Sequence, residues 1–189
     1  MLVDVDIVAL PIAFVGVLAI FYGASMKLAD LFDEHGLHWF RGDAAVFGLL
    51  WGVFGSLLVL ANPVVANALL AQMVCYIIRR LLDYWNHAVA AAVIIVTFFV
   101  TRQPFLPTTF VIFLVGFTLL GLVRDYYGKK KEPAWLYHLN EPAWYYLIVP
   151  LAYWLATGHW LALVVFPLYR LAYSGVKYGL YWRGSYTDL

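Results

Sequence analysis

Long apolar runs dominate the chain, and short polar segments separate them. Ile7 to Met26 carries no charged residue, and the uncharged stretch from Ala44 to Ile78 is interrupted near its middle by Asn62-Pro63. An Asn-Pro pair favours a turn, and a helix crosses the hydrocarbon core with about 20 residues. We therefore expect one spanning helix within the first run. The second run predicts a tight helical hairpin, with one arm ending at Ala61 and the other starting at Val64.

Four further apolar runs follow, and the first of them needs its aromatic and polar flanks to reach spanning length. Because all the runs are continuous rather than alternating, they exclude a membrane β-barrel. The pattern predicts an all-α, polytopic transmembrane bundle of seven helices, or six if the helix from Ala88 is re-entrant. We expect residues 1–189 to form a single integral membrane domain. The four runs are Ala88 to Thr101, Phe105 to Val123, Pro142 to Gly158 and Trp160 to Val176.

Composition supports the membrane assignment independently of the pattern. Hydrophobic residues make up 65% of the 189 residues and charged residues 12%, whereas soluble domains have about 45–50% and about 25%. A chain of this size has too little interior to hide so much apolar surface from water. A soluble globular domain and a disordered chain are therefore excluded. The net charge of +1 argues against nucleic-acid binding, so we expect a multi-pass protein of the cell membrane.

Lysine and arginine are unevenly distributed among the predicted loops. Cytoplasmic loops of membrane proteins carry an excess of these residues. Ten of the twelve lie on the side reached after the first, third, fifth and seventh predicted helices, whereas Arg102 lies on the opposite side and Arg170 within the last helix. We therefore expect the N-terminus outside and the C-terminus in the cytoplasm. The ten are Lys27, Arg41, Arg79, Arg80, Arg124, Lys129, Lys130, Lys131, Lys177 and Arg183.

The first polar segment of the inner side carries candidate metal ligands. If the first helix continues past Met26, residues Lys27, Asp30 and Glu34 share one of its faces, and Asp33 is adjacent. Carboxylate oxygens at such spacing can hold Mg²⁺, which proteins usually share with a substrate phosphate. We expect Asp30, Asp33 and Glu34 as metal ligands. The alternative is a solvated helix end that Gly36 stops.

The second polar segment combines basic residues with a histidine. On a continuous helix, Arg79 and Asp83 are four residues apart, and so are Asp83 and His87. Arg80 and Asn86 flank Asp83, so the sequence predicts one polar stripe at the entry to a span. Arginine binds phosphate or carboxylate bidentately, and histidine can transfer a proton. The alternative is anchoring to lipid headgroups together with an Arg79–Asp83 ion pair.

The third polar segment contains Arg124, a further candidate for phosphate binding, and then the run Lys129, Lys130 and Lys131. Each lysine close to an anionic membrane surface contributes about 1 kcal/mol of binding free energy. We therefore expect these three lysines to contact anionic lipid.

Arg170 lies inside the last apolar run, about two turns from its inner end. A charge at the centre of a span costs about 2.5–3.5 kcal/mol on insertion scales. We expect Arg170 either to reach the inner surface or to pair with an acid, for which Asp83, Asp125 and the acids of the first polar segment are the candidates.

A separate feature of the second helix is a face of small residues, Gly48, Gly52 and Gly55, which predicts close helix packing.

Three functions are compatible with these features. The first is an enzyme that acts on a lipid or isoprenoid phosphate at the cytoplasmic face, using Mg²⁺ and a proton carried by His87 or His35. In this hypothesis Asp30, Asp33, Glu34, Asp83 and His87 are catalytic, and the substrate-binding residues are Lys27, Arg79, Arg80, Asn86, Arg124 and Arg170. The second is a small-solute transporter or the membrane subunit of one, with Arg170 and Asp83 on the solute path. The third is a non-catalytic scaffold whose basic face binds lipid and partner proteins.

Overall fold

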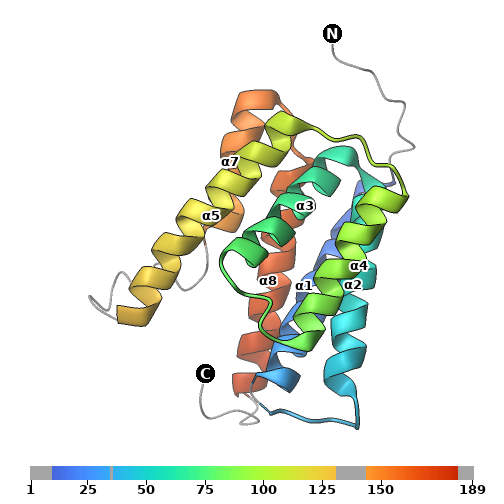
Figure 1. Cartoon of the computed structure of the whole chain (residues 1–189), viewed down its shortest axis with the longest axis vertical. Helices are drawn as coiled ribbons and strands as arrows, with labels where there is room; N and C mark the ends of the chain where they lie inside the picture. The colour runs from blue at the N-terminus through green and yellow to red at the C-terminus, as the bar shows by residue number, and fades with distance from the viewer. Residues whose placement is uncertain (1–9, 35, 131–143, 183–189) are drawn as a thin grey trace.

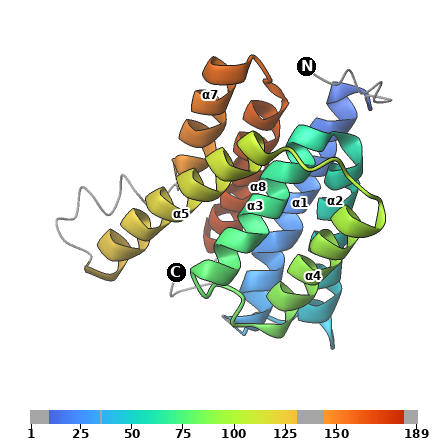
Figure 2. The ribbon, with the colours of Figure 1, turned by 45° about the horizontal axis from the view of Figure 1, so that its top comes forward.

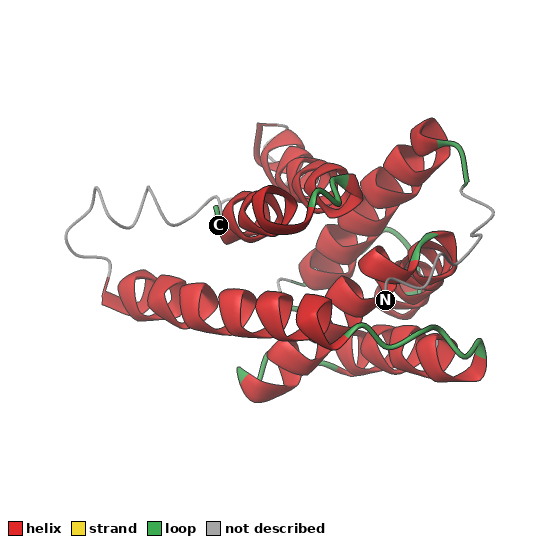
Figure 3. Cartoon of the chain, turned by 90° about the horizontal axis from the view of Figure 1, so that it is seen from above, coloured by secondary structure: helices red, strands yellow, loops and turns green. Residues whose placement is uncertain are grey.

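A computed structural model describes residues 10–34, 36–130 and 144–182. Within these residues the chain is helical and contains no strand (Figure 3), so the prediction of an all-α protein is confirmed. One described helix overlaps each of the seven predicted apolar runs (Figure 1). The helices are α1 Ile12–Asp33, α2 Asp43–Ala61, α3 Pro63–Ile78, α4 Trp85–Val100, α5 Pro107–Lys130, α7 Tyr145–Thr157 and α8 Leu161–Trp182.

Among the described residues, three helices are long and apolar enough to cross a membrane, namely α1, α2 and the part of α5 from 107 to 127. The apolar helices α3, α4 and α7 have 16, 16 and 13 residues. Large apolar side chains are exposed on the outer faces of the bundle, as expected of a protein in contact with lipid. These features suggest membrane association. The exposed side chains include Val17, Phe21, Leu49, Leu57, Val96, Phe99, Val115, Leu119, Ile148 and Leu155.

Successive helices run in alternating directions, as Figure 1 shows. The connecting residues 36–42 and 79–84 therefore lie at one end of the bundle. The short connections at Asn62, 101–106 and 158–160 lie at the opposite end. The polar segments that follow α1 and α3 thus share one end of the molecule.

Helix α3 occupies the centre of the bundle (Figure 2). Thirteen of its 16 residues are buried, and it contacts α2, α4, α5 and α8. The turn before it forms where expected, because the Asn62 side chain accepts hydrogen bonds from the backbone amides of Val64 at 2.8 Å and Val65 at 3.4 Å. Pro63 occupies the first helical position, where its missing N–H costs nothing.

The glycine face of α2 packs closely against α4, so the packing prediction is confirmed. A Cβ atom on Gly48 would lie 2.7 Å from the Cβ of Asn86, and one on Gly55 would lie 2.5 Å from the side chain of Ile94. Only glycine allows the two backbones to approach this closely. This contact holds the first turn of α4 beside α2.

The polar stripe predicted for residues 79–87 does not form, because the segment is not one continuous helix. Helix α3 ends at Ile78, Arg80 adopts a left-handed conformation with φ of 56°, and Tyr84 is extended before α4 begins. The Leu81 amide donates to the Tyr76 carbonyl at 2.9 Å and closes the end of α3. As a result, the side chains of this segment are directed to different parts of the bundle.

Substitution of Gly23 tests the packing of α1 against α8. A Cβ atom on Gly23 would overlap the backbone carbonyl of Tyr169, so Gly23→Ala has to push the two helices apart. Overpacking of this kind costs about 1–3 kcal/mol, and we expect the melting temperature to fall by about 2–10 °C. Circular dichroism during heating of the detergent-solubilised protein measures this change.

Gly175→Ala is the matched control, because a Cβ atom on Gly175 has nothing within 4 Å. We expect this variant to melt at the wild-type temperature or slightly above it, since alanine favours a helix by about 1 kcal/mol over glycine. Equal melting temperatures for the two variants would contradict the close approach of α1 and α8.

Candidate functional site

A cavity of about 390 Å³ lies at the end of the bundle where α1 and α3 end and α4 begins. Residues from all seven described helices border it, and carboxylates, guanidinium groups and phenols share its wall. The lining residues are Met26, Asp30, Glu34, Trp51, Tyr76, Leu81, Asp83, Tyr84, His87, Arg124, Tyr145, Tyr146, Tyr169, Arg170 and Tyr173.

One wall of the cavity brings two carboxylates to a histidine. Asp30 and Glu34 lie one turn apart at the C-terminal end of α1, which continues past Met26, and His87 lies in the first turn of α4. His87 Nε2 is 3.0 Å from Asp30 Oδ1 and 3.7 Å from Glu34 Oε1. Asp30 and His87 are buried, whereas the Glu34 side chain is 32% exposed.

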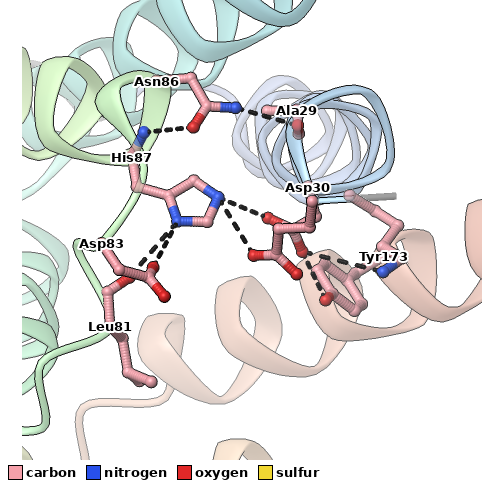
Figure 4. Close-up of polar contacts among 9 residues, drawn as sticks. Ala29, Asp30, Leu81, Asp83, Asn86, His87 and Tyr173 are labelled. Carbon is pink, nitrogen blue, oxygen red and sulfur yellow. Dashed lines mark hydrogen bonds and ion pairs between the residues drawn. The ribbon is translucent and has the colours of Figure 1, made fainter. Parts of the chain in front are cut away.

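The other ring nitrogen of His87 faces the polypeptide. Nδ1 lies 3.3 Å from the Leu81 carbonyl oxygen and 3.8 Å from Asp83 Oδ1 (Figure 4). Asn86 places this turn of α4, because its side-chain amide donates to the Ala29 carbonyl at 2.9 Å and its side-chain oxygen accepts from the His87 amide at 2.7 Å. Asn86 therefore connects α4 to the helix turn that carries Asp30, instead of facing the cavity.

Asp30 has two further partners on its own side of the cavity. The Tyr173 hydroxyl of α8 donates to Asp30 Oδ2 at 2.6 Å (Figure 4). Lys27 Nζ is 3.9 Å from the same oxygen and lies 5.1 Å from the centre of the Tyr173 ring. Lys27 is thus a buried counter-charge for Asp30, and it is not among the residues that line the cavity.

Two arginines lie in the same cavity as the carboxylates. Arg124 comes from α5 and Arg170 from α8, and the Arg170 guanidinium lies 4.7 Å from the centre of the Tyr173 ring. Arg170 therefore borders a cavity that is also lined by Asp30, Glu34 and Asp83. These three are among the acids named from the sequence as candidate partners for Arg170.

A hydrogen-bonded network of tyrosines around Gln72 forms the inner part of the site, and sequence reasoning missed it. Gln72 Nε2 donates to the hydroxyls of Tyr76 at 2.6 Å and Tyr169 at 2.7 Å, and its oxygen accepts from Tyr22 at 3.3 Å. The hydroxyls of Tyr76 and Tyr146 lie 2.9 Å apart. The only signal in the sequence was Gln72 itself, a polar residue inside an apolar run that requires buried partners.

Arg79 does not face the cavity. Its side chain is 1% exposed and binds the carboxylate of Asp125 at 2.8 Å, across α3 and α5. It also donates to the Gly121 carbonyl at 3.2 Å, and a side chain on Gly121 would overlap the guanidinium. Arg79 thus fixes α5 next to α3. Because Asp125 follows Arg124 in the sequence, this ion pair also positions Arg124.

Two of the other predicted residues lie outside the cavity. Asp33 and Arg80 are not among its lining residues, and Arg80 is exposed. Lys129 and Lys130 belong to the last turn of α5, and Lys131 and His35 lie outside the described residues. Of the predicted acids, Asp30, Glu34 and Asp83 line the cavity together with His87.

The pKa of the Glu34 carboxyl is raised to about 7, mainly by burial and in part by the neighbouring Asp30 carboxylate, while His87 opposes the shift. A carboxyl with such a pKa can give or accept a proton near neutral pH. The same proximity makes Glu34 a candidate metal ligand, because one donor atom from each of Asp30, Glu34 and His87 lies within 4.8 Å of the other two.

No known protein family, curated protein or solved structure matches the chain.

The pH dependence of stability tests the pKa of Glu34. Its reference pKa is 4.5 in the unfolded chain, against about 7 in the folded protein, so folding takes up a proton between these pH values. The free energy of unfolding therefore falls as pH rises through this window, and the full cost is present above pH 7. Because the side chain is 32% exposed, solvent screening reduces this cost to about 1 kcal/mol.

In chelator-containing buffer we expect Glu34→Gln to raise the melting temperature by about 2–4 °C at pH 8. At pH 5, where Glu34 is protonated in the folded protein, the variant should melt like the wild type. Asp33→Asn serves as the control, since Asp33 is one residue away and outside the cavity. An equal effect of Glu34→Gln at both pH values would contradict the raised pKa.

Proposed function

We propose that the protein is a multi-pass protein of the cell membrane whose seven helices cross the bilayer, with the N-terminus outside and the C-terminus in the cytoplasm. The alternating helix directions, the exposed apolar side chains and the one-sided distribution of lysine and arginine support this proposal. The cavity then faces the cytoplasm. Lys129 and Lys130 end α5, and anionic lipid is the partner we propose for the run Lys129, Lys130 and Lys131.

Within this topology, the protein acts as an enzyme on a lipid or isoprenoid phosphate at the cytoplasmic face. One observation carries the proposal, namely that a single cavity contains Asp30, Glu34 and His87 together with Arg124 and Arg170. Phosphoryl chemistry needs a cation and positive side chains around the same phosphate, because negative charge is spread over its oxygens during reaction. The cavity offers both: carboxylate and imidazole groups that can bind the cation, and two guanidinium groups that can bind the phosphate.

The residues divide into three roles under this proposal. Asp30 and Glu34 hold a divalent cation, with His87 beside them. Arg124 and Arg170 bind the phosphate, for which the guanidinium fork is suited. Asp83 lies at the exposed edge of the cavity, with its Oδ1 atom 3.8 Å from His87 Nδ1. At this position it can accept a proton from a group that faces the solvent.

The inner end of the cavity favours an enzyme over a transporter. A solute path has to continue through the bundle, whereas here Tyr22 and Tyr169 are fully buried and each is hydrogen-bonded to the buried side chain of Gln72. Opening this region would break the hydrogen bonds between Gln72 and the tyrosines, each of which contributes about 0.5–1.5 kcal/mol net. A cavity closed on one side suits a reaction at the membrane surface.

The proposed reaction is tested with protein reconstituted into vesicles that contain phosphatidic acid or a polyprenyl phosphate, with Mg²⁺ and Mn²⁺ supplied. Mass spectrometry of the extracted lipids follows the headgroup. We expect a change of the phosphate-bearing headgroup that Asp30→Asn and Arg170→Gln each reduce by about 100-fold or more. Asp33→Asn and Arg80→Gln are the matched controls outside the cavity, and we expect both to retain the activity.

Each alternative function predicts a different result in the same vesicles. Uptake of a solute without any chemical change, blocked by Arg170→Gln, would replace the enzyme by a transporter. Lipid binding that depends on the lysine run alone, with no lipid product and no uptake, would support the scaffold.

A further inference from the structure

We propose that His87 is itself a metal ligand, so that Asp30, Glu34 and His87 form a site for a transition metal such as Mn²⁺ or Zn²⁺ in preference to Mg²⁺. This inference names the cation of the site and rests on the proposed function only in using the same cavity. Metal binding can be measured without any lipid reaction, so the two proposals fail separately.

The distances fit coordination to one ion. Ligand atoms about 2.1 Å from a shared ion lie about 3.0 Å apart at right angles and about 3.4 Å apart in a tetrahedral arrangement. His87 Nε2 lies 3.0 Å from Asp30 Oδ1 and 3.7 Å from Glu34 Oε1. Small side-chain adjustments therefore suffice to place an ion between the three donors, and the adjoining cavity leaves room for water or substrate oxygens as further ligands.

The hydrogen-bonding pattern of the ring directs a lone pair at the carboxylates. His87 Nδ1 faces the Leu81 carbonyl oxygen at 3.3 Å, and a carbonyl can only accept, so Nδ1 carries the hydrogen in the neutral ring. In the neutral ring Nε2 then presents its lone pair to two carboxylate oxygens, an arrangement that repels unless a proton or a metal cation lies between them. In metal-bound histidines, the ring nitrogen that does not bind the metal typically donates its hydrogen to a carbonyl, a carboxylate or water, as Nδ1 does here.

His87 Nε2 is also a buried polar atom without a hydrogen bond. The residue is 6% exposed, and Nε2 makes no hydrogen bond of acceptable geometry within the described part of the chain, although it points at Asp30 and Glu34. Buried polar atoms in proteins are nearly always satisfied. A metal ion at this point satisfies Nε2 and neutralises the pair of carboxylates at the same time.

A second layer of contacts holds the ligands in place. The Tyr173 hydroxyl donates to Asp30 Oδ2 at 2.6 Å, which leaves Oδ1 directed toward His87. The Asn86 side chain holds the backbone of His87 and binds the Ala29 carbonyl, one residue before Asp30. Such supporting contacts orient ligands and typically change metal affinity by about 10–100-fold when removed.

The ligand types decide which metal is favoured. Mg²⁺ prefers oxygen ligands and keeps several waters, whereas imidazole nitrogen suits transition metals, with affinity rising from Mn²⁺ through Co²⁺. A set of one imidazole and two carboxylates therefore discriminates against Mg²⁺. The sequence alone had suggested three carboxylates and hence Mg²⁺, because Asp33 is adjacent to the pair and His87 is far away along the chain.

The test uses the full-length protein in detergent, stripped of metal with a chelator and titrated with Mn²⁺ alone. The free Mn²⁺ signal in electron paramagnetic resonance gives the stoichiometry and the dissociation constant. We expect one Mn²⁺ per chain and at least a 10-fold excess of Mg²⁺ needed to displace half of it. We also expect Co²⁺ in place of Mn²⁺ to show the visible absorption of a nitrogen-ligated ion.

Three variants separate ligation from general electrostatics. His87→Ala should weaken Mn²⁺ binding at least about 10-fold and remove the nitrogen-dependent Co²⁺ spectrum, and Tyr173→Phe should weaken binding about 10-fold with the Co²⁺ spectrum retained. Asp33→Asn removes a nearby negative charge outside the cavity and should leave the affinity within about 2-fold. Glu34→Gln, at the exposed edge of the site, provides a ligand variant should His87→Ala fail to fold by circular dichroism.

The proposal is overturned if the wild type binds no Mn²⁺, if Mg²⁺ competes at equal concentration, or if the ligand variants bind Mn²⁺ like the wild type. The first result would mean that a protonated His87 pairs with Asp30 in place of a metal. Mn²⁺ binding that depends on His87, together with unchanged lipids in the vesicle assay, would support the metal site and reject the proposed reaction.

Discussion

The close contact between the first turn of α4 and the last turns of α1 is the interaction on which the candidate site depends. Gly48 of α2 removes the side chain that would hold Asn86 away, and the Asn86 amide then reaches the Ala29 carbonyl. Asp30 and His87 are the next residues along their respective helices. A buried amide hydrogen bond between two helices thus sets the separation of the carboxylate and the imidazole, which lie 3.0 Å apart.

The surrounding bundle must satisfy the charges that this contact buries. Asp30 receives a hydrogen bond from Tyr173 and lies near Lys27, and the arginines of α5 and α8 border the same cavity. Unpaired charges are costly in an apolar interior, whereas paired and hydrogen-bonded charges are tolerated. The concentration of charge at one end of the bundle, above a network of tyrosines and Gln72, is consistent with a site that works from one membrane face.

Helix α5 contributes to the site through a different kind of contact. The buried guanidinium of Arg79 binds Asp125 bidentately and rests on Gly121, so it fixes the rotation of α5 against α3. Arg124 precedes Asp125 and turns toward the cavity. Arg79 is therefore a structural residue in this fold, although its charge and its position in the sequence resemble those of a phosphate-binding residue.

The sequence by itself determined the helical architecture and the end of the molecule at which the polar residues gather. Continuous apolar runs specify helices, Asn62-Pro63 specifies a turn, and i, i+4 spacing places Asp30 and Glu34 on one face, since all three are local properties of the chain. Only the tertiary structure decided that His87, and not Asp33, joins these two acids, and that Arg79 pairs with Asp125. Those partners lie on different helices, and their choice depends on where α3 stops, how closely α2 admits α4 and which buried groups must be satisfied.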